Sequence, residues 1–311
     1  MTPLLGCWLF GSDHMPDFKI TLQTEQIPDS GILTGHCANN DAWSVGSAIL
    51  GCRTDMYCCE EGDGDCFELY PPDHPTCDPD GVIAIQGWLN ATEEDINGWV
   101  EDFYNAKSFL NAQGTYLLLN CEQPIHVGDW HAYNDNPSLQ NQIFEAMKKR
   151  ADIFKSYFPQ ATVSLGPSFR PQNRGIYNNI ILQRIESLER AGDYGVFDNM
   201  DCWEPRPYFA WGPGDGPDYL NWTRNAVRQG LDVTSELTIS NGSHLPLCVN
   251  SSFRIFNDGS ATPGAFVDLE TALAQLEVVL EYPNVIVMGW WEGYYDPDQI
   301  DFIQDLNLCS L

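Results

Sequence analysis

Eight short apolar runs constrain the fold of this 311-residue chain more than any other feature of its sequence. Each run ends at or near a polar or carboxylate residue, and amphipathic stretches of helical period separate most of them. Continuous apolar runs of this length suit strands that are buried on both faces, as in a parallel sheet covered by helices. The runs are 4–10, 82–89, 116–121, 162–165, 194–197, 231–239, 245–249 and 285–291.

Eight such strands alternating with helices predict an α/β fold, the (β/α)8 barrel, in which the chemistry takes place at the carboxyl ends of the strands. One helix is expected to begin after Thr92, where a cap precedes three acidic residues. Further helices are expected at 138–158, 178–191, 218–230, 267–282 and 297–306. The polar residues at the expected strand ends are Asp13, Gln86, Glu122, Asp198, Asp201, Glu236, Asn250 and Glu292.

Residues 11–80 interrupt the alternation of strands and helices without any long amphipathic helix. A stretch of this length without regular structure is uncommon unless it is functional or separately cross-linked. We interpret residues 11–80 as a disulfide-tied insertion after the first strand, near the mouth of the barrel. The chain is then a single domain, residues 1–311, with one insertion.

The formal net charge of −29, from 44 acidic and 15 basic residues, excludes several classes of partner. Such a charge repels nucleic acid and anionic membranes, so neither is expected as a partner. No apolar stretch reaches the roughly 18 residues that span a bilayer. The acidity is also consistent with nothing more than solubility in a salty medium.

Eleven cysteines indicate an oxidising compartment. A polar, loop-rich segment cannot bury enough apolar surface to hold itself, so disulfides are favoured over a metal site. The cysteines contain no CxxC pair of the kind zinc sites use, and neither a metal nor a cofactor is expected. Four sequons, at Asn90, Asn221, Asn241 and Asn250, agree with a secreted glycoprotein. Six cysteines lie close together: Cys37, Cys52, Cys58, Cys59, Cys66 and Cys77.

The first candidate for chemistry is Glu122, which follows an expected strand and precedes Pro124. Glycoside hydrolysis needs a carboxylic acid that protonates the leaving oxygen. Trp130 and His131 come next on the same loop, and aromatic rings commonly pack on sugar faces. A structural role, as a loop cap or a partner of Arg170, is the alternative for Glu122.

A second candidate segment carries three acids, Asp198, Asp201 and Glu204, around Trp203. If the strand at 194–197 continues to Asp198, that carboxylate lies near the barrel axis and the other two lie on the loop. Clustered carboxylates raise one another's pKa, which favours a general acid at neutral pH. Calcium binding through the same oxygens is the alternative, although the spacing is not that of an EF-hand loop.

The third candidate segment runs from the last expected strand into large rings, with Glu292 among them. Adjacent strand residues point to opposite faces, so only one of Trp290 and Trp291 can face a pocket. Glu236, at the end of run 231–239, is a further candidate carboxylate. The expected substrate-binding residues are Trp88, Trp130, His131, Trp203, Trp290, Trp291, Tyr294 and Asn250.

Three motifs resemble the barrel glycoside hydrolases, in particular the hyaluronidase and chitinase-like group. They are 120–124 (Asn-Cys-Glu-Gln-Pro), 201–203 (Asp-Cys-Trp) and 289–290 (Gly-Trp). The resemblance covers residues 81 to 296, and residues 11–80 do not fit it. It implies a Glu that acts as the acid and an Asp two residues before it that steadies the acetamido group of the substrate. Here Asn120 stands at the Asp position.

The sequence therefore predicts a secreted hydrolase that binds or cleaves an oligosaccharide or polysaccharide, with Glu122 as the acid. Asp201, Asp198, Glu236 and Glu292 compete for the role of the second carboxylate. The rival hypothesis is a non-catalytic extracellular protein, glycan-binding or filament-forming, that keeps the barrel as a framework.

Overall fold

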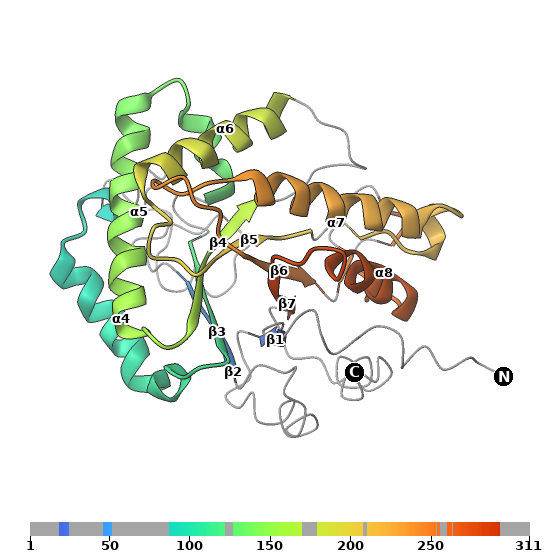
Figure 1. Ribbon diagram of the computed structural model, residues 1–311, viewed down its shortest axis with the longest axis horizontal. Helices are drawn as coiled ribbons and strands as arrows, with labels where there is room; N and C mark the ends of the chain where they lie inside the picture. The colour runs from blue at the N-terminus through green and yellow to red at the C-terminus, as the bar shows by residue number, and fades with distance from the viewer. Residues whose placement is uncertain are drawn as a thin grey trace, which may run out of the picture.

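A computed structural model describes residues 19–24, 46–51, 87–121, 127–169, 179–207, 210–252, 254–255, 260–262 and 264–292 (Figure 1). These residues contain one parallel sheet with the strand order β1-β7-β6-β5-β4-β3-β2. The two edge strands of this order, β1 and β2, approach each other, so the sheet is curled. The strands are β1 (Lys19–Thr24), β2 (Gly46–Gly51), β3 (Thr115–Asn120), β4 (Thr162–Phe169), β5 (Cys202–Pro205), β6 (Leu247–Ser252) and β7 (Val285–Glu292).

Helices join successive strands from β3 onward and cover the outer face of the sheet (Figure 1). This alternation confirms an α/β fold with parallel strands and crossover helices. The α-helices are α4 (Glu93–Lys107), α5 (Pro137–Tyr157), α6 (Asn179–Tyr194), α7 (Tyr219–Glu236) and α8 (Leu269–Val279), and the short 3-10 helices are η1 (Ser108–Leu110), η2 (Val127–Tyr133) and η3 (Pro213–Asp215).

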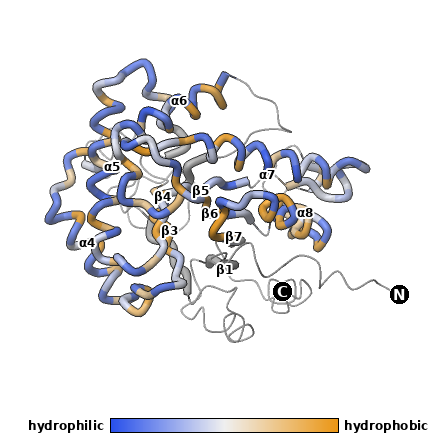
Figure 2. Tube along the Cα trace, viewed as in Figure 1, coloured by the Kyte–Doolittle hydropathy of each residue, from blue (hydrophilic) through white to orange (hydrophobic). Residues whose placement is uncertain are grey.

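The two faces of the sheet carry different side chains. Residues that alternate along the strands, such as Leu117, Leu165 and Val249, pack with the helices in the main hydrophobic core. The intervening residues face the inside of the curled sheet, where Tyr116 and Val287 belong to a small separate cluster. Figure 2 shows the apolar colour concentrated on strands and on α8, which is the most apolar of the helices.

Four of the expected strands are confirmed, since runs 116–121, 162–165, 245–249 and 285–291 fall on β3, β4, β6 and β7. Two others are wrong. Residues 194–197 are the end of α6 and a turn closed by the Val196 amide on the Ala191 carbonyl, and residues 231–236 complete α7. Their apolar side chains are buried there as well, and periodicity alone does not separate a short buried strand from a buried helix end.

Three strands were not expected. β5 lies just after the run at 194–197, and β1 and β2 lie within residues 11–80, so part of that interval belongs to the sheet. Residues 87–90 are helical, which corrects the end of the expected strand at 82–89. Residues 4–10, 82–86 and 297–306 and the six clustered cysteines lie outside the described residues.

The expected start of the first long helix is confirmed by its capping box. The Thr92 side chain accepts a hydrogen bond from the Asp95 amide, and the Asp95 carboxylate accepts one from the Thr92 amide. Each bond satisfies an amide that the first turn of α4 leaves without a helical partner. The Thr92 bonds lower the pKa of Asp95.

Replacing this cap is the mildest test of the fold. Thr92→Ala is expected to lower the free energy of unfolding by about 1 kcal/mol, the usual cost of losing an N-cap side chain. Chemical denaturation measures the change, and Glu101→Gln, at an exposed position of α4, is the matched control. Equal stability of the two variants would show that the box does not form in solution.

Candidate active site

One level of the curled sheet, near the carboxyl ends of its strands, is polar. The register pairs Gly51 with Asn120, Asn120 with Gly166 and Asn250 with Gly289, while Leu165 opposite Trp203 sets Gly166 beside Glu204. Barrel interiors are commonly filled by branched aliphatic side chains, so a level of this composition is unusual. We call it the polar level; its members are Gly51, Asn120, Gly166, Glu204, Asn250 and Gly289.

Glu204 and Arg206 form a buried ion pair at the polar level. Arg206 Nε donates to Glu204 Oε1 at 2.8 Å, and the two side chains are 3% and 0% exposed. Arg206 Nη2 also donates to Asn120 Oδ1 at 2.9 Å, and Asn250 Nδ2 donates to Glu204 Oε1 at 3.1 Å. These bonds connect β3, β5 and β6 through side chains. The guanidinium of Arg206 balances the charge of Glu204, so the pair carries no net charge.

Gly166 makes room for the Glu204 carboxylate. A Cβ atom at position 166 would overlap Glu204 Oε2 and lie 2.6 Å from Glu204 Cδ and 2.8 Å from Leu118 Cδ1. Any side chain there would therefore displace the carboxylate. The absence of a side chain on β4 is what lets β5 place a glutamate inside the curled sheet.

A second interior level lies two residues nearer the amino ends of the strands. Tyr116 Oη and Ser164 Oγ are hydrogen-bonded at 2.7 Å. Cys202 of β5 and Cys248 of β6 form a disulfide with a Cα–Cα distance of 5.7 Å. Cys121, on the opposite face of its strand, is also disulfide-bonded. The Tyr116–Ser164 pair and the Cys202–Cys248 disulfide thus lie on the inner face of the sheet, on the amino-terminal side of the polar level.

The expected acids divide between the described and undescribed parts of the chain. Glu122 and Tyr294 lie outside the described residues. Glu292 ends β7 at the carboxyl edge, opposite Thr24 of β1. The position of Glu292 at a strand end is therefore confirmed, and its catalytic role stays a prediction.

Asp198 and Asp201 lie at the amino-terminal end of the sheet, so their expected placement at carboxyl ends of strands is wrong. Asp201 precedes β5, pairs with Lys155 at 2.6 Å and accepts the Val163 amide at 2.7 Å. Asp198 accepts the amide and hydroxyl of Ser240 in a turn. Both carboxylates tie loops together at the amino-terminal end of the sheet, which in barrel folds usually serves stability.

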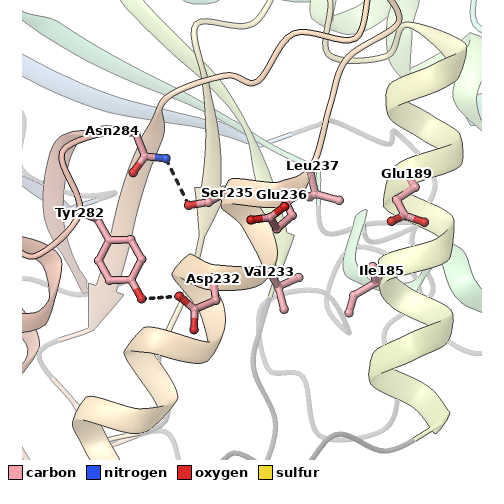
Figure 3. A pocket seen from close by; sticks show the side chains of 9 residues that line it. All are labelled: Ile185, Glu189, Asp232, Val233, Ser235, Glu236, Leu237, Tyr282 and Asn284. Carbon is pink, nitrogen blue, oxygen red and sulfur yellow. Dashed lines mark hydrogen bonds between the residues drawn. The ribbon is translucent and has the colours of Figure 1, made fainter.

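Glu236 is also at the amino-terminal end, because residues 231–236 of the run complete α7 and none of the run is a strand. It lines a groove of about 560 Å³ between α6, α7 and the start of β7 (Figure 3). The Tyr282 hydroxyl donates a hydrogen bond to Asp232 at the groove wall. The pKa of Tyr282 is raised, mainly by burial and secondarily by this hydrogen bond. The residues that line it are Ile185, Glu189, Asp232, Val233, Ser235, Glu236, Leu237, Tyr282 and Asn284.

Three of the expected aromatic platforms are buried in the main core, which corrects the expectation of rings exposed in a cleft. Trp88 is 3% exposed, with the Arg150 guanidinium 4.1 Å above its ring. Burial lowers the pKa of Arg150 to about 10. Trp130 and Trp203 have no exposed area and pack edge-on or tilted against Phe144 and Phe197.

The other expected contact residues are distributed as follows. His131 is half-buried in η2, and Trp290 and Trp291 belong to β7. Asn250 is the one that the structure brings to the polar level, where its amide binds Glu204. The described residues contain no group of three or more His, Cys, Asp or Glu side chains suited to a metal ion. Among the described helices, none is both long and apolar enough to cross a bilayer.

Arg206 was not a candidate from the sequence, and Glu204 was named only as one of three clustered acids, on an expected loop. Glu204 looked like a loop residue because the apolar run before it was interpreted as the strand. The sequence Glu-Pro-Arg gave no signal for a site, because a proline argues against a central strand and β5 lies between β4 and β6.

Comparison with known proteins gives a likeness of fold. No family model matches the chain, and no curated protein matches its sequence. Bee venom hyaluronidase superposes with a TM-score of 0.55 at 10% identity, covering 93% of this chain and 97% of that one. The same protein in complex with a hyaluronic acid tetramer gives a TM-score of 0.56 at 9% identity, covering 94% and 96%. The resemblance inferred from the motifs is thus confirmed at the level of fold: this chain has the α/β fold of bee venom hyaluronidase.

Proposed function

We propose that this protein is a glycoside hydrolase whose active site lies at the polar level, with Glu204 as one of its carboxylates. The observation that carries the proposal is the fully buried Glu204, held at the carboxyl end of a parallel strand by Arg206 and Asn250. The desolvation cost of a buried ion pair can exceed the energy that its pairing returns, so the presence of this pair inside the sheet supports a functional role. The carboxyl ends of the strands are where barrel enzymes carry out their chemistry.

The pairing of Glu204 determines its role. A carboxylate that accepts charge-assisted bonds from a guanidinium is held as an anion and is a poor proton donor. An anion fixed at this edge stabilises the positive charge that develops on the sugar ring in the transition state. Glu122 is the proton donor in this proposal, and Glu292 is a further acid at the same edge of the sheet.

Charge selects the class of glycan. A net charge of −29 repels a polyanion, and the hyaluronic acid bound to the bee venom protein is one. Neutral or cationic glycans meet no such barrier. We therefore assign this protein a neutral or amino-sugar glycan rather than a uronic-acid polymer.

The remaining expectations belong to this proposal. They are a complete eight-stranded barrel over residues 1–311, a disulfide-rich segment within residues 11–80, secretion and N-glycosylation. The four sequons do not support N-glycosylation equally. Asn90, Asn221 and Asn241 are exposed, whereas Asn250 has no exposed area and binds Glu204, so a glycan there is incompatible with the fold.

The alternative is a non-catalytic glycan-binding protein built on the same fold. Two observations favour it: Asn120 replaces the acid that the resemblance implies, and Glu204 is held by its neighbours rather than exposed. Under this hypothesis the ion pair at the polar level only stabilises the interior of the sheet.

Matched carboxylate variants decide between the two functions. On a neutral oligosaccharide that the native protein cleaves, Glu122→Gln is expected to lower kcat by about 10²–10⁴-fold, the range for lost general acid catalysis. Glu204→Gln is expected to lower it by about 10²–10³-fold, the range for a lost electrostatic contact. Steady-state kinetics give these values, and Glu236→Gln, in the groove at the far end of the sheet, should keep native turnover.

Two outcomes would contradict the proposal. Native turnover in Glu204→Gln, with the fold checked by circular dichroism, would make Glu204 structural. Binding without hydrolysis across neutral, cationic and anionic glycans would establish the non-catalytic alternative. A preference for anionic over neutral and cationic glycans would overturn the substrate class alone.

A further inference from the structure

The disulfide Cys202–Cys248 lies directly beneath two members of the polar level. Glu204 is two residues after Cys202 on β5, and Asn250 is two residues after Cys248 on β6. Residues i and i+2 of a strand point to the same face, and the strand rises about 6.6 Å over that distance. The bonded pairs Cys202–Cys248 and Glu204–Asn250 are therefore consecutive links on the inner face, and each joins β5 to the β6 residue two positions beyond the one opposite it in the register.

Backbone pairing between these strands is sparse. β5 has four residues and ends in Pro205, which has no amide hydrogen to donate. Within the described residues, the register of β5 with β6 consists of Trp203 opposite Leu247, supported by the Trp203 amide on the Pro246 carbonyl. On its other side, the register of β6 with β7 extends over six pairs. Among the strand pairs whose register the described residues give, the covalent link thus joins the one with the fewest register pairs to fix the relative height of its strands.

The height of β5 relative to β6 matters at the polar level. Asn250 Nδ2 and Arg206 Nε converge on the same oxygen of Glu204, at 3.1 and 2.8 Å. A slide of one strand by a fraction of a residue would break the first of these bonds, because hydrogen bonds weaken steeply beyond about 3.5 Å. The Arg206 guanidinium would move with β5 and keep its bond to Glu204, so the bond that is lost would be the one from Asn250.

We propose that Cys202 and Cys248 are positioning residues of the active site, whose disulfide sets the height of Glu204 against Asn250. The inference rests on the function proposed above. The cysteines themselves touch no substrate, since both are fully buried in the cluster with Tyr116 and Val287. Their effect passes through the two strands to the carboxylate.

The test compares the double variant Cys202→Ala/Cys248→Ala with Met147→Ala, a core truncation in α5 that destabilises the fold and leaves the sequences of β5 and β6 unchanged. Both should melt earlier than the native protein. At a temperature where both stay folded, the cysteine variant should show kcat lower by roughly 10²-fold, the loss that a misplacement of about 1 Å produces. KM should change little, and Met147→Ala should keep the native kcat.

Unchanged kcat in the cysteine variant would overturn the proposal. If the double alanine variant does not fold, Cys202→Val/Cys248→Ala fills more of the space and replaces it in the same assay.

A second measurement separates this inference from the proposed function. The carboxyl carbon of Glu204, labelled with ¹³C and assigned by its loss in Glu204→Gln, reports the surroundings of the carboxylate without any substrate. If the native protein proves inactive, the proposed function fails, and the resonance still decides the role of the disulfide. A shifted resonance and a changed titration curve in the cysteine variant support it, whereas superimposable curves reject it.

Discussion

Arg206→Met is expected to lower the free energy of unfolding by about 3–5 kcal/mol, the cost of breaking a buried ion pair from one side. The methionine fills most of the volume but leaves the Glu204 carboxylate buried without its counter-charge, and Asn120 Oδ1 loses its donor. Urea denaturation measures the loss.

The chain offers a matched control for this variant. Arg224 pairs with Glu277 at 2.9 Å on the surface between α7 and α8, with side chains 28% and 44% exposed. Arg224→Met should cost no more than about 1 kcal/mol, as is usual for exposed pairs. The double variant Glu204→Gln/Arg206→Met removes both charges and should recover much of the loss. Equal costs for the two arginine variants would mean that water reaches Glu204.

Gly166→Ala is expected to cost roughly 3 kcal/mol or more and to abolish turnover, although it adds a single methyl group. Overpacking in a full interior costs about 1–3 kcal/mol, and here the displaced atom is the carboxylate that binds Arg206 and Asn250. Leu118 blocks the other side of the position, so the carboxylate has to leave its partners. Thermal denaturation and the activity assay give the two readouts.

Two further variants make this prediction specific. Gly98→Ala, in α4, meets nothing within 4 Å and should stabilise the helix by up to about 1 kcal/mol. Combining Gly166→Ala with Glu204→Asp shortens the acid and should cost less than the sum of the two single changes. Additive costs would show that Gly166 and Glu204 do not collide.

The sequence predicted the parts of the fold that depend on continuous burial. The described residues of strands β3, β4, β6 and β7 are largely buried on both faces because helices cover one side and the curled sheet encloses the other. The same criterion failed at 194–197, where Val196 and Phe197 are equally buried in a turn. It also missed β5, whose four residues include a charge that no solvent reaches.

The polar level shows why the site was only partly predictable. Asn250 was selected because it ends an apolar run, and the structure does bring it to Glu204. Glu204 and Arg206 gain their meaning from contacts with β3 and β6, which lie 46 or more residues away in the chain. Trp88, Trp130 and Trp203 were selected by residue type, yet large rings also fill the space between sheet and helices.

The burial of Cys202–Cys248 imposes an order on the maturation of this protein. Neither sulfur is accessible once the sheet has curled, so no oxidoreductase can reach the pair in the finished fold. The bond has to form while β5, α7 and β6 are still open to their surroundings, and the oxidation removes two electrons and two protons that an external acceptor takes up. A chain that folds before it is oxidised would enclose two thiols that an oxidant reaches only when the protein unfolds. The state of this pair, thiol or disulfide, therefore records whether oxidation came before folding in each molecule.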